Sequence, residues 1–280
     1  MSSISGRFVN RAAPLSSSPM RIVLPLALAL LAGSSAALAQ GRAARPSCTG
    51  EESTDAIASV GPRLEVRLAS GRLAKLSGLR APDDRSANAA AWLMRRAGQA
   101  LAVTATGPED RWGRLPVRLA TRDRPGLDLA EGLVENGLAL VDPGEASGLC
   151  RPELLALEAT AREQALGLWA DGRYKPAAAD DRDGLARRVG HFVVVEGRVR
   201  SVGERRQRTY LNFGPDGSRD LTITIPKRTW TTMVGKGLSA AALRDSRIRA
   251  RGLLERGRGP AIEVTIAEMI EVLPRGDGRP

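Results

Sequence analysis

Two short segments of the chain gather charged residues whose types suit chemistry at a phosphate group. The first, LSGLRAPDD at residues 76–84, carries Arg80 and ends in Asp83 and Asp84. The second, DRWGRLPVRL at residues 110–119, carries Arg114 after an aromatic-glycine pair. A carboxylate can orient a water molecule, and cations stabilise the negative charge that gathers on an attacked phosphorus. The two segments therefore indicate a site for phosphodiester chemistry or phosphate binding.

The elements that would position these segments are mostly strands. Leu64, Val66 and Leu68 alternate with polar residues, which is typical of a half-buried strand, and the turn ASGR follows. Further strands are predicted at residues 73–79, 101–106 and 115–120. Helices are predicted from a Ser86 cap to about residue 98, from an Asp128 cap to Gly137, and from Pro152 to Gly167. This order suits a small barrel with helices on its flank.

The second half of the chain is predicted to be a second barrel. Strand patterns occur in HFVVVEGRVR, RTYLNFG, DLTITIP, SRIRARGLLE and AIEVTIAEMIEVL, and TWTTMVGKGLSAAAL is predicted to form a short helix after the third strand. Five strands with a helix in that place are what an OB-type barrel needs. The predicted fold class is α+β, mainly β, with two OB-like five-stranded barrels.

Residues 64–169 resemble the staphylococcal nuclease (thermonuclease) family. The similarity rests on three motifs in order: the strand-turn-strand and Pro-acid corner of VRLASGRLAKLSGLRAPDD, the aromatic-Gly-Arg turn of DRWGRLPVRL, and the closing helix LLALEATAREQALGLW. The resemblance implies an OB-like barrel with flanking helices, and a calcium-dependent nuclease site with a carboxylate base and two phosphate-binding arginines. It places the base at Asp83, one phosphate-binding arginine at Arg114 and the other at Lys75, which keeps the charge but not the bidentate fork.

The same resemblance implies that the metal site is lost. The family's two metal carboxylates fall on Leu64 and Arg80, and calcium prefers charged oxygen ligands. A guanidinium beside a dication costs on the order of 1–4 kcal/mol by Coulomb's law. We therefore expect no metal ligand set and no cofactor, with Ca²⁺ required only if a nuclease survives. Asp84 and Asp110 are alternative acids, and Arg80 could instead hold phosphate directly.

The second half resembles OB-fold nucleic-acid-binding modules. Such surfaces combine basic side chains with aromatic platforms, although a strand arginine is more often part of a solvated face. The predicted nucleic-acid-binding residues in this half are Arg198, Arg200, Tyr210, Lys227, Arg228, Arg249 and Arg251. Phe213 and Trp230 are predicted to belong to the core, and His191, the sole histidine, to be structural.

The N-terminal segment has the composition of a secretory signal peptide. Arg7, Arg11 and Arg21 precede an apolar run, and Ala37-Leu38-Ala39 follows it. We expect export to the periplasm or the medium and no stable membrane span after cleavage; a retained anchor is the alternative. In an exported chain, Cys48 and Cys150 are expected to form a disulfide, and two buried thiols are the other interpretation.

The predicted organisation is a signal peptide at 1–39, an N-terminal arm at 40–59, a nuclease-like domain at 60–170, a linker at 171–186 and a second OB-like domain at 187–275. Removal of the signal lowers the net charge of +11 by three, to +8. The basic excess then lies in residues 181–280, which hold 20 basic and 12 acidic residues, against 19 of each in residues 40–180. Such an excess favours a polyanionic partner, although an arginine-rich proteome would also produce it.

Three functions fit these observations. The first is a catalytically degenerate thermonuclease-family protein that binds nucleic acid or another polyanion. The second is an active nuclease that hydrolyses DNA or RNA, with Asp83 orienting water. The third is an envelope scaffold for protein interactions.

Overall fold

The computed structural model describes residues 50–123, 126–145 and 149–274. The predicted signal peptide and Cys48 lie outside these residues, so the export signal and the Cys48–Cys150 bond stay predictions. Among the described residues, no helix combines the length and the apolar character that a membrane crossing requires.

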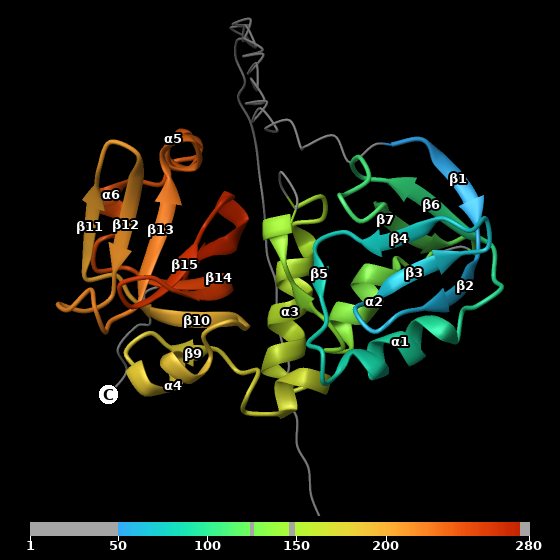
Figure 1. Ribbon diagram of the computed structural model, residues 1–280, viewed down its shortest axis with the longest axis horizontal. Helices are drawn as coiled ribbons and strands as arrows, with labels where there is room; N and C mark the ends of the chain where they lie inside the picture. Colours follow the sequence, from blue (N-terminus) through green and yellow to red (C-terminus); the bar gives the residue numbers. More distant parts are fainter. Residues whose placement is uncertain (1–49, 124–125, 146–148, 275–280) are drawn as a thin grey trace, which may run out of the picture. The chain divides into compact units, whose positions relative to one another are not determined.

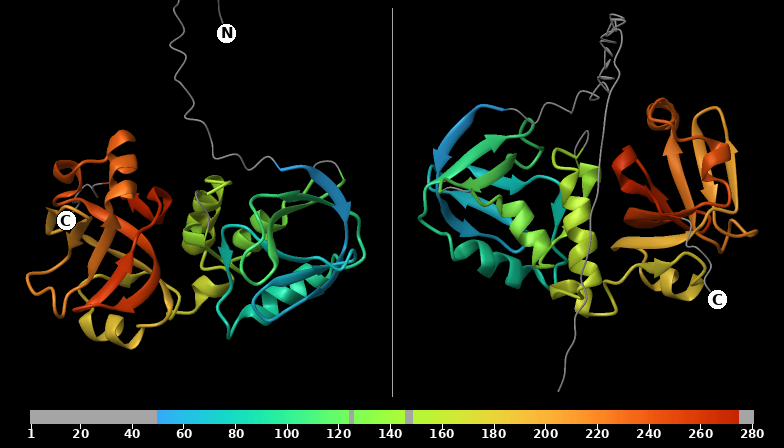
Figure 2. Two further views of the ribbon diagram at one scale, coloured as in Figure 1. Left: turned by 45° about the horizontal axis from the view of Figure 1, so that its top comes forward. Right: turned by 180° about the vertical axis from the view of Figure 1, so that it is seen from behind.

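The first half forms a six-stranded sheet in the order β1-β6-β7-β4-β3-β2. Its strands are β1 (Glu52–Asp55), β2 (Ile57–Val60), β3 (Glu65–Leu68), β4 (Leu73–Leu76), β6 (Leu101–Ala105) and β7 (Arg114–Thr121). A single residue, Ala56, separates β1 from β2, and these two strands stand at the two ends of the order. The bent β1–β2 segment therefore returns the sheet on itself, as in an OB-like barrel (Figures 1 and 2).

Helices cover this sheet, as the nuclease-like resemblance implied. They are α1 (Ser86–Met94), α2 (Leu129–Glu135) and α3 (Glu153–Glu163), with short 3₁₀ turns at Pro143–Glu145 and Gly167–Ala170. Asp128 caps α2 as predicted, accepting hydrogen bonds from the backbone N–H groups of Ala130 and Glu131. Ser86 does not cap α1. It is the first helical residue, and its hydroxyl donates to the carbonyl of Asp83 at 3.0 Å, which ties the Pro-acid corner to the helix.

The corner itself is held by a two-stranded ladder. β5 (Leu79–Arg80) pairs antiparallel with β8 (Leu140–Val141), with Arg80 opposite Leu140. The corner residues therefore start from a fixed strand rather than from a free loop.

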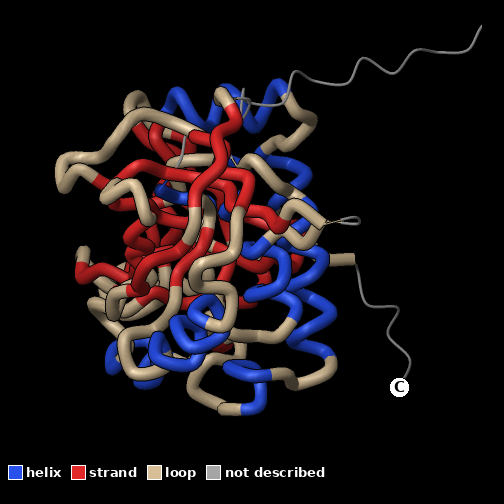
Figure 3. The backbone as a smooth tube through the Cα atoms, turned by 90° about the vertical axis from the view of Figure 1, so that its right-hand side faces the viewer, coloured by secondary structure: helices blue, strands red, loops and turns tan. Residues whose placement is uncertain are grey.

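The second half forms another sheet in the order β11-β12-β13-β15-β14-β10-β9, with β16 on β14. Its elements are β9 (Ala177–Ala178), α4 (Arg182–Arg187), β10 (Phe192–Arg198), β11 (Ser201–Glu204), β12 (Arg208–Asn212), β13 (Thr222–Pro226), α5 (Lys227–Gly235), α6 (Ala240–Leu243), β14 (Arg247–Arg256), β15 (Pro260–Glu263), a 3₁₀ turn (Ala267–Met269) and β16 (Ile270–Val272). β10 and β11 are again consecutive in the chain and lie toward opposite ends of the order, and a helix follows β13. This is the OB-like arrangement predicted for this half. In Figure 3, which looks from the side of the first half, helices lie around the edges of the strands.

The segment predicted as a linker carries secondary structure. β9 pairs in parallel with β10, and α4 follows with Asp181 as its N-cap. Neither element shows in the sequence pattern, because β9 is only two alanines long and α4 is short and mostly polar.

A buried ion pair joins α3 to β14. Arg251 on β14 donates to Glu158 on α3 at 2.6 Å, and neither side chain is more than 1% exposed. Arg251 also donates to the carbonyl of Val141 and to Glu271. Arg251 and Glu158, which are 93 positions apart in the chain, therefore fix β14 of the second half to α3 of the first half.

Candidate functional site

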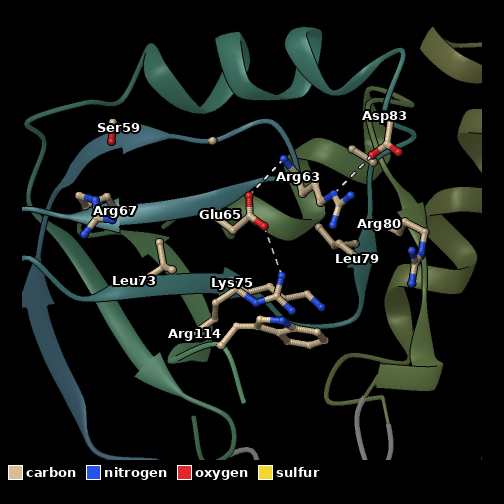
Figure 4. Close-up of a pocket in the computed structure, with 13 residues that line it drawn as sticks. Ser59, Arg63, Glu65, Arg67, Leu73, Lys75, Leu79, Arg80, Asp83 and Arg114 are labelled. Atoms are coloured by element: carbon tan, nitrogen blue, oxygen red, sulfur yellow. Dashed lines mark hydrogen bonds and ion pairs between the residues drawn. The ribbon is translucent and has the colours of Figure 1, made fainter. Parts of the chain in front are cut away.

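A pocket of about 720 Å³ opens on the first sheet and brings the predicted site residues together (Figure 4). Lys75, Arg80, Asp83 and Arg114 all line it, and they come from β4, β5, the Pro-acid corner and the start of β7. Five of its lining side chains are basic and two are acidic. The pocket therefore has an excess of positive charge, although the first half of the chain is neutral overall.

Lys75 is the half-buried cation of the pocket. Burial, and then the nearby charges of Arg114 and Arg80, lower the pKa of Lys75 to about 8. A lysine in these surroundings gains from a bound anion, because the anion offsets both the lost hydration and the repulsion.

Arg114 is held by two carboxylates. Its Nε donates to Asp110 at 2.8 Å and its Nη1 to Glu65 at 3.3 Å, and its side chain is 15% exposed. Gly113 precedes it with a φ of +70°, which a residue with a Cβ rarely adopts, so the aromatic-Gly-Arg turn depends on this glycine. Arg114 is thus aimed into the pocket, but an incoming phosphate has to compete with Glu65 for it.

Arg80, where the resemblance places a metal ligand of the family, is held by an acid and an aromatic ring. Its Nε donates to the buried carboxylate of Asp142 at 2.8 Å, and its guanidinium lies 5.2 Å from the ring centre of Phe192. The guanidinium is thus positioned by a carboxylate and an aromatic ring, and it stays partly exposed on the pocket wall.

Asp83 lies at the mouth of the pocket. Its side chain is 85% exposed and forms a 3.9 Å ion pair with Arg63. The next residue, Asp84, points elsewhere: it accepts hydrogen bonds from the Tyr174 hydroxyl at 2.5 Å and from Arg173 at 3.1 Å. The bond from Tyr174, together with the charge of Arg173, lowers the pKa of Asp84.

Glu65 is a pocket residue that the sequence analysis missed. It lies directly opposite Lys75 in the β3–β4 ladder, and its carboxylate lies between Arg63 and Arg114 in Figure 4. The preceding Leu64, where the resemblance places the family's first metal ligand, is buried in the core with a φ of +60°. The hairpin register around ASGR was the signal that could have identified Glu65, because it places this acid across from Lys75.

Trp112 is the second residue that was missed. It lines the pocket, yet 61% of it is exposed, which is unusual for a large aromatic side chain. The guanidinium groups of Arg111 and Arg114 lie 4.0 Å and 4.8 Å from its ring centre. The aromatic-Gly-Arg turn therefore presents a flat apolar face among cations.

The predicted residues of the second half do not join this pocket. Arg198, Arg200, Tyr210, Lys227, Arg228, Arg249 and Arg251 are absent from the linings of both large pockets among the described residues. Arg251, predicted as a nucleic-acid-binding residue, is instead buried by ion pairs with Glu158 and Glu271, which the period-two pattern could not reveal. Arg249 is paired with Glu196 and Glu271, and Trp230 is a core residue as predicted.

The pocket's donor set does not suit calcium. Its two carboxylates, Glu65 and Asp83, each face an arginine, and Arg80 replaces an acid. Among the described residues, no group of three or more His, Cys, Asp or Glu side chains is placed to hold a metal ion. Calcium needs six to eight oxygen ligands, preferably charged ones, and the two paired carboxylates of this pocket do not provide such a set.

Residues 75–171 match the family model described as staphylococcal nuclease homologue. This range holds the corner, the aromatic-Gly-Arg turn and the closing helix α3. No curated protein matches the chain.

Proposed function

Because residues 75–171 form a staphylococcal nuclease-like domain, we propose that this protein binds the phosphate backbone of single-stranded nucleic acid and has lost calcium-dependent cleavage. The observation that carries the proposal is Arg80, a cation held by Asp142 and Phe192 on the wall of the pocket that also contains Lys75 and Arg114. Three cations from three strands surround one cavity, as a phosphate site requires.

Binding proceeds through charge and stacking. Lys75 and Arg80 hold phosphate oxygens. Arg114 also binds the phosphate when its ion pair with Glu65 weakens. Trp112 offers its exposed face to a base, a contact worth about 1–3 kcal/mol per base in single-strand binders. Duplex bases are stacked on each other and cannot reach this face, so the proposal favours single strands.

The proposed loss of cleavage is supported by the exposure and pairing of the acidic residues in the pocket. Asp83 is exposed at the pocket mouth and paired with Arg63, and the first-strand position that the family gives to a metal ligand is a buried leucine. The other carboxylate of the pocket, Glu65, is paired with Arg114.

A surviving nuclease is the second candidate, because Asp83, Lys75 and Arg114 still line one pocket. The purified chain from Gln40 to Pro280 is incubated with single-stranded DNA and RNA, once with calcium and once with a chelator. We expect binding and no cleavage in both cases. Calcium-dependent cleavage that Asp83→Ala abolishes would replace binding by hydrolysis as the function.

The binding itself is tested with charge-removing variants. Lys75→Gln with Arg80→Gln should weaken the binding of a labelled ten-nucleotide DNA by more than tenfold, since a hydrogen bond to a charged group is worth about 1.5–3 kcal/mol. Arg206→Gln with Arg258→Gln, two exposed arginines in hairpins of the second half, removes the same charge and should have a small effect. Equal losses in the two variants would mean that net charge, rather than the pocket, drives binding. Tighter, pocket-dependent binding of a sulfated glycan would identify another polyanion as the partner.

Residues 1–39 are included in the proposal as an export signal, so the working form is placed in the periplasm or the medium. Nucleic acid met there is extracellular or released by lysis. Expression of the full chain with fractionation of the cells tests this part, and a cytoplasmic, uncleaved product would contradict it.

A further inference from the structure

A second pocket of about 570 Å³ adjoins the first. The two share Arg80, Ala81 and Asp83 in their linings, so the Pro-acid corner forms a wall of both. The second pocket lies where the end of α4 and the start of β10 approach this corner, and none of the functions assigned above uses it.

The second pocket is also rich in cations. Besides Arg80, its lining holds Arg173, Lys175, Arg187 and Arg188, with His191 beside them. Its acids are Asp83 and Asp84, which form ion pairs with Arg63 and Arg173 respectively. In this part of the described chain, Lys175, Arg187 and Arg188 form no ion pair with a described carboxylate. Their charges can therefore attract an anion to the pocket.

The floor of this pocket is apolar. Phe192, Val193, Val194 and Leu253 line it, and Leu253 is 46% exposed. A cationic rim over an apolar floor with an aromatic ring suits a ligand that alternates charge with flat apolar groups. A nucleic-acid strand has this alternation, whereas a lone inorganic anion uses only the rim.

We propose that the second pocket is a second subsite for the same single strand, in which Arg187 and Arg188 hold phosphates beyond those bound at Lys75 and Arg80. This inference rests on the proposed function of the first pocket. Arg80 lies on the path between the two subsites, because it lines both pockets and its guanidinium lies against Phe192. The strand then crosses from the nuclease-like domain to the second half at the Pro-acid corner.

The decisive experiment compares two double variants, each of which removes two arginines. Arg187→Ala with Arg188→Ala removes two rim cations, and Arg206→Ala with Arg258→Ala removes two exposed arginines that line neither pocket. Affinity is measured by fluorescence anisotropy for a labelled dinucleotide and a labelled ten-nucleotide DNA over a range of salt concentrations. Circular dichroism and a thermal melt confirm that both variants are folded.

We expect the rim variant to bind the ten-nucleotide DNA about tenfold more weakly than the control variant. Its slope of log K against log salt should be smaller by about 1.4, as two phosphate contacts to a single strand are lost. The dinucleotide, which fills only the first pocket, should bind the rim variant and the wild type alike.

Each other outcome has a distinct meaning. If the wild type binds the long DNA and Lys75→Gln with Arg80→Gln abolishes this, yet the rim and control variants are equal, the second subsite is refuted and the first pocket stands. If the wild type binds neither oligonucleotide, the proposed function itself fails. If the rim variant loses its affinity for a sulfated oligosaccharide but keeps its affinity for DNA, the proposed nucleic-acid subsite is refuted and the second pocket is a glycan site.

Discussion

Lys75 is a lysine whose charge changes near the pH at which the protein is expected to work. Burial and the charges of Arg114 and Arg80 bring its pKa to about 8, and a bound phosphate raises that pKa again. Affinity for single-stranded DNA should therefore fall as the pH rises through and above 8, by up to about tenfold for one charged hydrogen bond. Anisotropy titrations from pH 6.5 to 9.5 measure this.

Lys75→Arg is the matched control for this prediction. Arginine keeps its proton across the whole range, so the variant should bind with an affinity that does not vary with pH. If the DNA affinity of the wild type varies with pH as little as that of Lys75→Arg, Lys75 does not contribute to the binding contacts.

The same lysine should lower the stability of the folded chain. Its pKa is about 8 when folded and about 10.4 when unfolded, so the unfolded state binds more protons between these values and stability from this group rises with pH there. Lys75→Met should therefore melt a few degrees higher than the wild type at pH 7 and lose that pH dependence. Lys175→Met, at an exposed position, should leave the melting temperature unchanged. A lower melting temperature for Lys75→Met would show that Lys75 stabilises the fold.

Trp112 should matter for binding and not for folding. It is 61% exposed on the pocket rim, so Trp112→Ala removes a stacking face without opening a cavity. We expect the affinity for single-stranded DNA to fall by about 1–3 kcal/mol, and the free energy of unfolding to change by less than about 0.5 kcal/mol. Quenching of its fluorescence by the oligonucleotide gives a direct signal. An unquenched tryptophan would place the bases elsewhere.

At the scale of single elements, alternation predicted the strands but not the whole pocket. Val66 and Leu68 are buried as their spacing indicated, and Asp83, Lys75 and Arg114 line one pocket, although their roles there stay predictions. Glu65 was missed because the motif match pointed to Leu64. The left-handed backbone at Leu64 buries that side chain and leaves the next residue facing Lys75. A local pattern contains no information on such a conformation.

Contacts between distant elements were the other limit. The arginines of β14 have the spacing of a solvated face, yet the acids of α3 and β16 neutralise two of them. The partner of Arg251 lies 93 residues away, so only the packing of α3 against β14 could identify it.

This pairing predicts a large and specific loss of stability. Arg251→Met leaves Glu158 buried without its main partner, which should reduce the free energy of unfolding by about 3–5 kcal/mol. Glu158→Gln keeps an acceptor for the backbone N–H of Val141, so adding it to Arg251→Met should recover part of the loss. Urea unfolding of both single variants and of the double variant gives the coupling energy. Strict additivity would show that the two charges do not depend on each other.

At the scale of the whole molecule, the distribution of charge does not locate the site. Residues 181–280 carry the basic excess, but Arg247 and Arg249 on β14 are paired with Glu196. Residues 40–180 are neutral in sum, and yet the first pocket collects five cations there. The fold separates the charges of a neutral segment, and this separation, rather than composition, creates the excess of positive charge in the pocket.

If the chain is exported as proposed, its stability should also depend on one crosslink between distant positions. Cys150 comes just before α3, and its predicted partner is Cys48 in the N-terminal arm. A bond closing a loop of about 100 residues stabilises mainly by restricting the unfolded chain, typically by about 2–4 kcal/mol. Cys48→Ser with Cys150→Ser should lower the urea midpoint of the oxidised protein accordingly, and reductant should bring the wild type to the same midpoint. Identical midpoints for the wild type with and without reductant would mean that no such bond stabilises the fold. Because α3 also carries Glu158, a Cys48–Cys150 bond would tie the N-terminal arm to the helix on which the buried ion pair with Arg251 depends.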